Sequence, residues 1–586
     1  MKDQKNSATA HVQRIEHVDD IPVLFALLKQ LRLAELLDDH FPVHHLWKGK
    51  LTFGEVVTTW LVFILSQGDH RLSRVEQWAK QNLLTLQACL GKPVRALDFH
   101  DDRLADVLDA LADAERYQSF ETDLNQGMIR VYKLRPEVFR TDTTTASSYA
   151  KVLDENGMLQ FGHSKDNDNL PQLKIASTTL DPLGVPITTV VVPGHKADDP
   201  TYIPQMKKVN EVFGLGGKTF FGDCKQGALE TRAYAASTKD YYVNPLSETH
   251  LSREDRLALL APVFSGTQKL KPVYRPGASP DEEPELVARG FSYDVPLSAT
   301  VEGRRVRWKE RRWVVQSLAF ANSQAENLEA RLEKATTQLG QLGERKQGKK
   351  RLSAEEMNAT VEEILKKHRV EGLLACRVQT TTTQEKVKRR YGKRPEQSVR
   401  KEEHHVETTR REEAIAQAKQ AMGWQVYATN NLKLNVVGVV WGYRGQYRIE
   451  DGWSRLKGRP LSLSPMYLAD ENRMVGLVLL LTLAVRALTL LEWVVRRKLK
   501  ENDETLKGVY PSQAGRQTST PSAEMLLKVF RGIDLSVVEV DGQVSVHITE
   551  LTPLQKRLLK LWDFPKNLFQ RISLHCPKPP PRLSER

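Results

Sequence analysis

Near residue 131 the spacing of apolar side chains changes from a helical period to a period close to two. Four β-prone runs follow, interrupted by a Pro/Gly turn and by one helical stretch; they span 138–145, 172–179, 185–192 and 218–223. Two β-rich runs joined by a Pro/Gly turn are typical of a hairpin. The order of three antiparallel strands, a helix near 202–213 and a fourth strand therefore predicts a mixed sheet in an α/β domain.

Two aspartates stand on these runs, and we expect both at strand ends. Asp142 lies in the first run and Asp223 closes the last one. Glu450 lies far along the chain in 443–457, a segment that we interpret as one helix. Because sites on open sheets gather at strand ends, we expect the three carboxylates to converge on a pair of ions roughly 3.5–4 Å apart. Hard divalent ions prefer carboxylate oxygens, which favours Mg²⁺ or Mn²⁺ over zinc.

The segment around Glu450 places polar side chains at helical spacing. Tyr443, Glu450 and Lys457 are seven residues apart, so a continuous helix would carry them on one face. A carboxylate flanked by a phenol and an ammonium suits a phosphodiester, although an ordinary amphipathic helix also produces this spacing. Trp453 is a candidate to stack a displaced base, and a core aromatic is the alternative.

At 586 residues the chain exceeds what one hydrophobic core supports. The first part is rich in helical patterns and fits either a DNA-binding unit or a purely structural helical domain. The segment between Asp223 and Glu450 is too long for a connection inside one domain, so we expect an insertion. In it, 293–319 is predicted to be β, and 324–342 and 354–367 are predicted to form a helical hairpin.

The expected fold is α/β and multidomain, with a mixed-sheet core that a large α+β insertion interrupts and a helical domain precedes. The expected parts are a helical domain that is a candidate for DNA-end binding, the first part of the core, the insertion, the second part of the core with the helix of Glu450, and a C-terminal region with a flexible basic tail. They span 1–130, 131–245, 246–434, 435–500 and 501–586.

Composition points to a nucleic-acid partner. Lys and Arg number 86 against 73 acidic residues, a formal charge of +13 that favours a polyanion. Four scattered cysteines argue against a disulfide framework or a zinc knuckle and suit a reducing cytosol. The apolar run 475–495 contains Arg486 and Glu492, so we expect a buried helix and no membrane partner.

The Glu450 segment resembles the signature of the DDE transposases of bacterial insertion sequences. In the superfamily that it is most similar to, the third carboxylate lies in a motif of Tyr, two residues, Arg, three residues, Glu, six residues and Lys (YREK). Tyr443, Glu450 and Lys457 match this motif, whereas Gln446 stands where the motif has Arg. The resemblance covers roughly residues 15–500 and includes segments at 162–166, 223–225 and 456–461.

The resemblance implies a ribonuclease-H-like core, two Mg²⁺ ions for which Mn²⁺ can substitute, and a homodimer that holds double-stranded DNA at the element's inverted-repeat ends and the target DNA. Asp142 would bridge both ions, and Asp223 and Glu450 would each complete one ion's shell. The candidate phosphate-binding residues are Tyr443, Lys457, Arg444, Arg448 and Lys165. Arg444 or Arg448 would replace the motif arginine that is Gln446 here. The implied location is the bacterial cytoplasm, at the nucleoid through DNA.

We therefore expect a DNA transposase that cuts at inverted-repeat ends and transfers strands into target DNA. Two alternatives stay open: a metal-dependent nuclease on the same fold, and a non-catalytic DNA-binding relative. The intact trio of carboxylates argues against the second alternative, and Gln446 keeps it open. A weaker candidate metal site is His195, Asp198 and Asp199, for which we prefer a helix cap by Asp199 ahead of Pro200.

Overall fold

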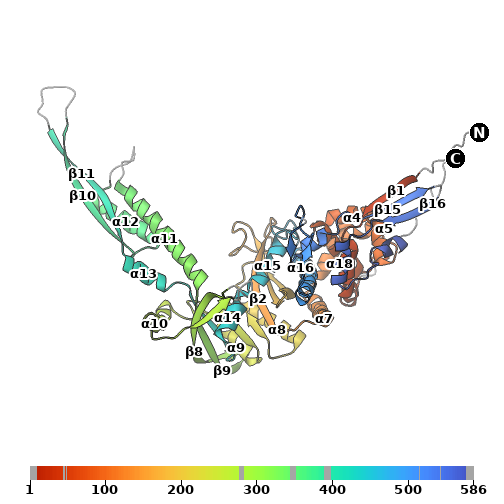
Figure 1. Ribbon diagram of the computed structural model, residues 1–586, viewed down its shortest axis with the longest axis horizontal. Coiled ribbons are helices and arrows are strands. Elements are labelled where there is room, and N and C mark those ends of the chain that lie inside the picture. Colours follow the sequence, from red (N-terminus) through yellow and green to blue (C-terminus); the bar gives the residue numbers. More distant parts are fainter. Residues whose placement is uncertain are drawn as a thin grey trace, which may run out of the picture. The chain divides into compact units, whose positions relative to one another are not determined.

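The computed structural model describes residues 10–43, 47, 49–275, 283–343, 352–387, 397–513, 515–540 and 543–575. The chain divides into two compact units (Figure 1). The first unit comprises residues 1–243, 298–308 and 442–586, and the second comprises 244–297 and 309–441. Residues 576–586, which include the tail that was expected to be flexible, lie outside the described residues.

The first unit contains a mixed sheet in the strand order β4-β3-β2-β5-β6. Its strands are β2 (Val138–Ser147), β3 (Gln172–Leu180), β4 (Val185–Pro193), β5 (Thr219–Phe221) and β6 (Tyr241–Pro245). The pairs β2–β3 and β3–β4 are antiparallel, whereas β5 is parallel to both β2 and β6. This mixed sheet confirms the expected α/β class.

Helices cover both faces of this sheet. Thr178 of β3 bonds Gln205 of α8 (Asp199–Phe213). Neighbouring Ser177 points the other way and lines a small pocket with residues of α15 (Tyr447–Lys457) and α16 (Glu471–Glu501). A further helix, α9 (Leu229–Ser237), connects β5 to β6.

Before the sheet the chain is helical, with a short strand, β1 (Ala10–His17), at its start. The helices are α1 (Ile21–Gln30), α2 (Leu33–His40), α3 (Phe53–Gln67), α4 (Leu72–Gln81), α5 (Leu83–Leu90), η1 (Ala96–Phe99), α6 (Asp101–Leu111) and α7 (Ala114–Tyr132). The stretches 72–90 and 101–132 each contain two helices. Asn82 separates the first pair, and Asp113 caps α7 through the backbone N–H of Arg116 at 3.1 Å.

The segment 443–457 is also divided, so the prediction of one helix there is wrong. α14 (Val436–Arg444) ends before Gly445, and α15 begins at Tyr447. The carbonyl of Gly442 accepts a hydrogen bond from the buried Arg140 at 2.8 Å, and backbone bonds of the tighter i to i+3 type close the turn. Tyr443 consequently belongs to one helix and Glu450 to the next.

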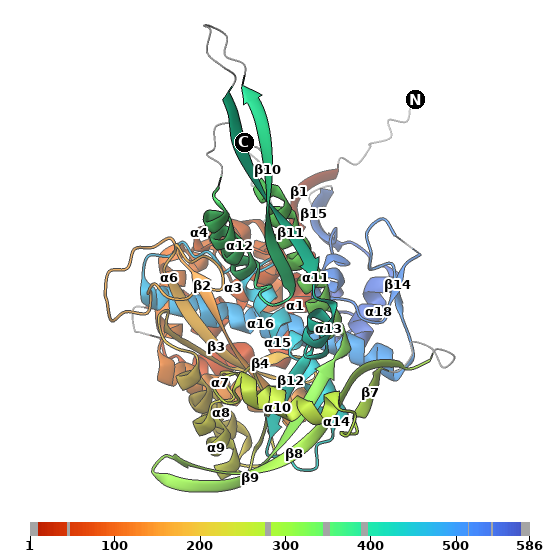
Figure 2. The ribbon, with the colours of Figure 1, turned by 90° about the vertical axis from the view of Figure 1, so that its left-hand side faces the viewer.

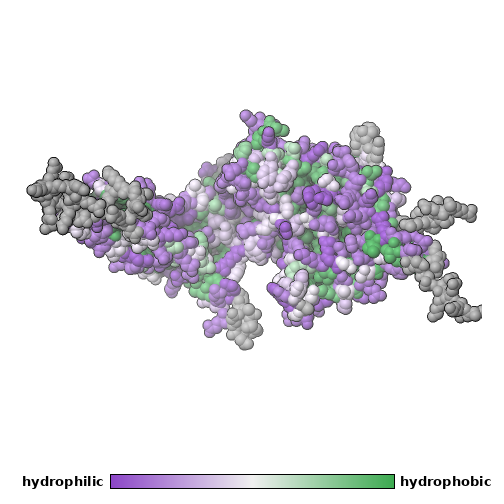
Figure 3. All heavy atoms as spheres, turned by 90° about the horizontal axis from the view of Figure 1, so that it is seen from above, coloured by the Kyte–Doolittle hydropathy of each residue, from purple (hydrophilic) through white to green (hydrophobic). Residues whose placement is uncertain are grey.

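The long apolar run forms the buried centre of the first unit. α16 is long and apolar enough to span a membrane, with a window of mean hydropathy 2.3, but 94% of that window is buried inside the protein. Its buried Arg486 pairs with Glu121 and donates to the carbonyl of Pro186 at 2.8 Å. Hydrophilic side chains predominate on the molecular face in Figure 3.

After α16 the chain returns to the N-terminal part. The C-terminal elements are β13 (Leu506–Lys507), β14 (Gln517–Thr518), α17 (Ala523–Lys528), β15 (Asp534–Val540), β16 (Gln543–Ile548), α18 (Pro553–Leu561) and α19 (Gln570–His575). β15 pairs antiparallel with β1 and with β16, so the two ends of the chain share a sheet.

The second unit contains strands and a helical hairpin. Its elements, two of which have their ends in the first unit, are α10 (Arg253–Phe264), β7 (Lys271–Arg275), β8 (Glu285–Val301), β9 (Arg304–Ser317), α11 (Leu318–Gly340), η2 (Gln341–Gly343), α12 (Ala354–His368), β10 (Leu374–Val387), β11 (Gln397–Arg410), α13 (Glu412–Gln420) and β12 (Trp424–Thr429). Leu328, Leu332 and Leu339 of α11 pack against Val361 of α12. The long β10–β11 hairpin beside these helices (Figure 2) was not predicted.

Candidate active site

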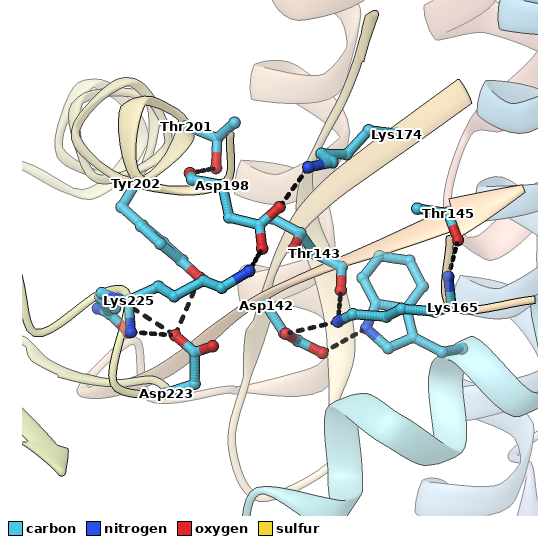
Figure 4. Close-up of polar contacts among 12 residues, drawn as sticks. Asp142, Thr143, Thr145, Lys165, Lys174, Asp198, Thr201, Tyr202, Asp223 and Lys225 are labelled. Carbon is cyan, nitrogen blue, oxygen red and sulfur yellow. Dashed lines mark hydrogen bonds and ion pairs between the residues drawn. The ribbon is translucent and has the colours of Figure 1, made fainter. Parts of the chain in front are cut away.

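Asp142 lies in the middle of β2, opposite Ser177 of β3, and not at a strand end as expected. Its side chain is 16% exposed. The indole Nε1 of Trp453 donates to Asp142 Oδ2 at 3.0 Å, and the Nζ of Lys165 lies 3.8 Å from Oδ1 (Figure 4). The carboxylate is therefore held from two sides, by a neutral donor and by a cation.

Asp223 lies two residues beyond the end of β5. Its side chain is held in an Asx turn by backbone N–H groups. Its Oδ1 accepts hydrogen bonds from the Tyr202 hydroxyl at 3.0 Å and from the backbone N–H groups of Lys225 and Gln226 at 3.0 and 3.1 Å (Figure 4). Tyr202 is buried on α8. The sequence does not indicate its hydrogen bond to Asp223, because nothing in its spacing distinguishes it from other aromatic residues on helices.

Strand register brings the two aspartates to the same level. β2 and β5 are parallel neighbours, and Arg140 pairs with Phe221. Asp142 and Asp223 each follow two residues after this pair, and neighbouring strands lie about 4.8 Å apart. Residues remote in sequence thus become neighbours because β5 is inserted beside β2.

Glu450 enters from α15. It lies in the first turn of that helix, is exposed, and precedes Trp453 by three residues, so both side chains lie on neighbouring positions of one helix face. Because Trp453 bonds Asp142, this face is directed toward β2. α15 contacts β2 directly.

Tyr443 lies near the end of α14 and not on the helix of Glu450. Burial raises the pKa of its phenol to about 12, and the charges of Asp223, Glu450 and Asp142 act in the same direction. Tyr443 is therefore a candidate neighbour of these carboxylates.

The titration of Asp142 reflects an incompletely compensated charge. Burial raises the pKa of Asp142, and the charge of Asp223 acts in the same direction. Lys165, the backbone of Thr143 and the Trp453 indole oppose the rise without cancelling it. The site concentrates negative charge that a divalent cation would stabilise.

The candidate phosphate-binding cations have contacts within the protein. Lys457 Nζ bonds Asp166 Oδ1 at 2.5 Å, and Arg448 lies 3.1 Å from Asp181. Lys165 Nζ donates to the carbonyl of Thr143 at 2.5 Å. Arg444 is half-buried at the end of α14.

A buried ion cluster that the sequence did not reveal links β2 to the α14–α15 junction. Arg140, only 1% exposed, donates to both carboxylate oxygens of Asp181 at 2.8 and 2.7 Å and approaches Gln446 Oε1 at 3.5 Å. Arg448 contributes the second cation. Gln446, at the place of the motif arginine, therefore faces an arginine supplied by β2. Asp181 lies in the turn between β3 and β4.

The predicted helix cap by Asp199 is wrong: Asp198 is the residue before α8, and its side chain makes no cap bond. Its carboxylate is held by Lys174 at 2.6 Å and by Lys225 (Figure 4). Although burial acts upward, these lysines lower the pKa of Asp198 to about 2, as in a structural ion pair.

The donor set fits Mg²⁺ or Mn²⁺. Asp142, Asp223 and Glu450 offer carboxylate oxygens, which are the ligands that hard divalent ions prefer. Over the described part of the chain, the group of three potential ligands whose atoms lie within 4.8 Å of one another is the exposed His100, Asp101 and Asp102. The three candidate carboxylates are more widely spaced than that, as ligands shared between two ions can be.

Comparison with known proteins gives two findings. Residues 12–122 match the model of a family described as a domain of unknown function (DUF4277). Among solved structures, the chain is similar to the piggyBac transposase in a synaptic complex with hairpin DNA, with 8% identity over 97% of this chain and 87% of that chain. The TM-score of 0.36 is too low to define a shared fold. A search of curated proteins finds no match.

Proposed function

We propose that this chain is a DNA transposase of the DDE class that cleaves DNA at the ends of a mobile element and joins them to target DNA. The observations that support the proposal are the register of β2 and β5, which places Asp142 level with Asp223, and the hydrogen bond from Trp453 to Asp142, which brings the helix of Glu450 to β2. The strand order β4-β3-β2-β5-β6, with three antiparallel strands followed by two parallel ones, supports a ribonuclease-H-like core.

In the proposed reaction Asp142, Asp223 and Glu450 hold two Mg²⁺ ions, or Mn²⁺ in their place. Such ions activate the attacking oxygen and stabilise the leaving oxygen of an in-line displacement. Trp453 orients the carboxylate of Asp142, and Tyr202 orients that of Asp223.

Recognition of DNA is proposed to involve positive charge around this site. Lys165 lies 3.8 Å from Asp142, and Lys457 bonds Asp166, the residue that follows Lys165. Tyr443 would add a hydroxyl donor. These groups, with Arg444 and Arg448, are the proposed contacts to phosphates. A homodimer would bring two element ends together, and the helical N-terminal part is the proposed end-binding region. The proposed location is the bacterial cytoplasm, at the nucleoid through DNA.

The test is cleavage of a DNA fragment that carries the gene's own flanking ends. Wild type is expected to release a 3′-hydroxyl in Mg²⁺ and to join it to target DNA, whereas Asp142→Asn and Glu450→Gln are inactive. Cleavage without joining would favour the nuclease alternative. Binding without cleavage in both Mg²⁺ and Mn²⁺ would contradict the proposal and favour a non-catalytic DNA-binding protein.

A further inference from the structure

Lys165 is the cation nearest to Asp142, and its position is fixed by β2 itself. Its backbone N–H donates to Thr145 Oγ1 at 3.0 Å, and its Nζ donates to the carbonyl of Thr143 at 2.5 Å (Figure 4). Both acceptors belong to the strand that carries Asp142. The ammonium is thereby held beside Asp142 Oδ1 at 3.8 Å, while Trp453 takes Oδ2.

This ion pair differs from the others around the site. Lys174 approaches Asp198 to 2.6 Å and Lys457 approaches Asp166 to 2.5 Å, both at hydrogen-bond distance. Lys165 lies beyond hydrogen-bond distance of Asp142, and its side chain is 48% exposed. Half-exposed pairs of this kind contribute only about 0–1 kcal/mol, so a doubly charged ion can displace the ammonium easily.

Asp166, the residue after Lys165, bonds side chains at and after the end of α15. Asp166 accepts hydrogen bonds from Lys457 at the end of α15 and from Ser464 at 2.9 Å. The backbone at Lys165 is therefore anchored on both sides, so displacement of the ammonium would break only its contacts with the Thr143 carbonyl and with Asp142. The displaced ammonium would remain near the carboxylates.

We propose that Lys165 is a resident counter-cation of Asp142, which lies beside Oδ1 of the carboxylate until a divalent ion displaces it toward a DNA phosphate. This inference rests on the proposed function. Trp453 is neutral and does not repel a metal ion, so Lys165 is the charge that opposes metal binding at Asp142. Lys165 consequently sets the metal affinity of the site as well as contributing to DNA binding.

The test is calorimetric titration of Mn²⁺ into the full-length protein without DNA. Lys165→Met should bind Mn²⁺ about 3- to 10-fold more tightly than wild type, because a repelling charge near the ion is removed. Lys165→Arg keeps the charge and should stay close to wild type. The matched control is Lys207→Met: Lys207 is 45% exposed, pairs with Glu302, and should leave the affinity unchanged.

Unchanged or weaker Mn²⁺ binding by Lys165→Met would overturn the inference. Mn²⁺ titration of Asp142→Asn distinguishes failure of the counter-cation role from failure of the proposed function. If Asp142→Asn weakens Mn²⁺ binding and Lys165→Met does not strengthen it, the metal site stands and the counter-cation role fails. If Asp142→Asn leaves Mn²⁺ binding unchanged, both proposals fail.

Discussion

Asp142 differs from Asp181 and Asp198 in how its charge is compensated. Asp181 is held by two arginines and Asp198 by two lysines. Asp142 has a neutral indole and a cation at 3.8 Å, and its pKa rises while that of Asp198 falls. Buried structural carboxylates are ordinarily paired. The longer ion pair leaves Asp142 more accessible to a metal ion than Asp181 or Asp198.

Trp453→Phe should lower the rate of Mg²⁺-dependent DNA cleavage. The ring is kept, but the hydrogen bond that orients Asp142 is lost, and bonds to charged groups contribute about 1.5–3 kcal/mol. We expect kcat to fall about tenfold with little change in KM for DNA. Trp424→Phe, which removes an indole bond to the Gln420 carbonyl in the second unit, is the control. An unchanged kcat would contradict the orienting role of the indole N–H.

Asp20→Asn should stabilise the protein at neutral pH. Burial raises the pKa of Asp20 from 3.8 to about 6. Between pH 4 and 6 the folded state therefore retains a proton that the unfolded state releases, so stability falls as pH rises through this window and is flat above it. We expect Asn, which cannot ionise and can still accept from Ser66, to raise the free energy of unfolding by about 3 kcal/mol at pH 7.

The gain from Asp20→Asn should vanish at pH 3.5, where Asp20 is protonated in the folded state. Urea unfolding at the two pH values measures it. An equal effect at both would show that the proton is not the cause.

At the scale of elements, the junction between α14 and α15 decides where Glu450 lies. Gly445 lies against Arg140, since a Cβ atom there would come within 2.3 Å of the guanidinium. Arg140 also bonds the carbonyl of Gly442 and, through Asp181, joins the β3–β4 turn to Arg448 of α15. The cluster thereby fixes α15 to the strand that carries Asp142.

Asp181→Asn should be destabilising. It leaves Arg140 buried with an uncompensated charge, and breaking a buried pair from one side costs about 3–5 kcal/mol. Because Asp181 is 12% exposed, we expect the lower end of this range in urea unfolding. Asp294→Asn, which breaks a more exposed pair with Arg311 in the second unit, should cost less than about 1 kcal/mol. Equal losses would contradict the role of the cluster.

Local periodicity predicted several elements well, but it failed where tertiary contacts determine the bounds of a helix or strand. The run 138–145 is β2, and 354–367 is α12, because alternation and helical stripes reflect burial on one side. The break at Gly445 depends on Arg140, which lies far away in sequence. The β10–β11 hairpin is polar and mostly exposed, so it carries no alternation to detect.

The residues of the candidate site likewise divide into those that the local sequence indicates and those that only tertiary contacts reveal. Asp142, Asp223 and Glu450 were selected by residue type and local pattern, and the strand register supports the proximity of the first two. Tyr202, Arg140 and Asp181 act through contacts between remote segments, so no spacing in the sequence indicates them. The predicted single face with Tyr443, Glu450 and Lys457 is wrong because two helices carry these residues.

At the scale of the whole molecule, the chain carries a net charge of +13. Binding to DNA should therefore depend strongly on salt, because each neutralised phosphate releases counterions. We expect the Kd for a duplex of the flanking ends to rise at least about tenfold between 50 and 200 mM KCl. Fluorescence anisotropy in Ca²⁺, without cleavage, measures it. A Kd that is independent of salt would contradict a phosphate-based interface.

The most direct measurement of the central claim is Mg²⁺-dependent nicking of end DNA by single carboxylate variants. Asp142→Asn, Asp223→Asn and Glu450→Gln should each lose more than about 100-fold in rate, which is the most that loss of an outer-shell partner costs. Asp451→Asn, at the exposed neighbour of Glu450, should cleave like wild type. Cleavage that survives substitution of the trio, or that is lost equally with Asp451→Asn, would contradict the assigned site.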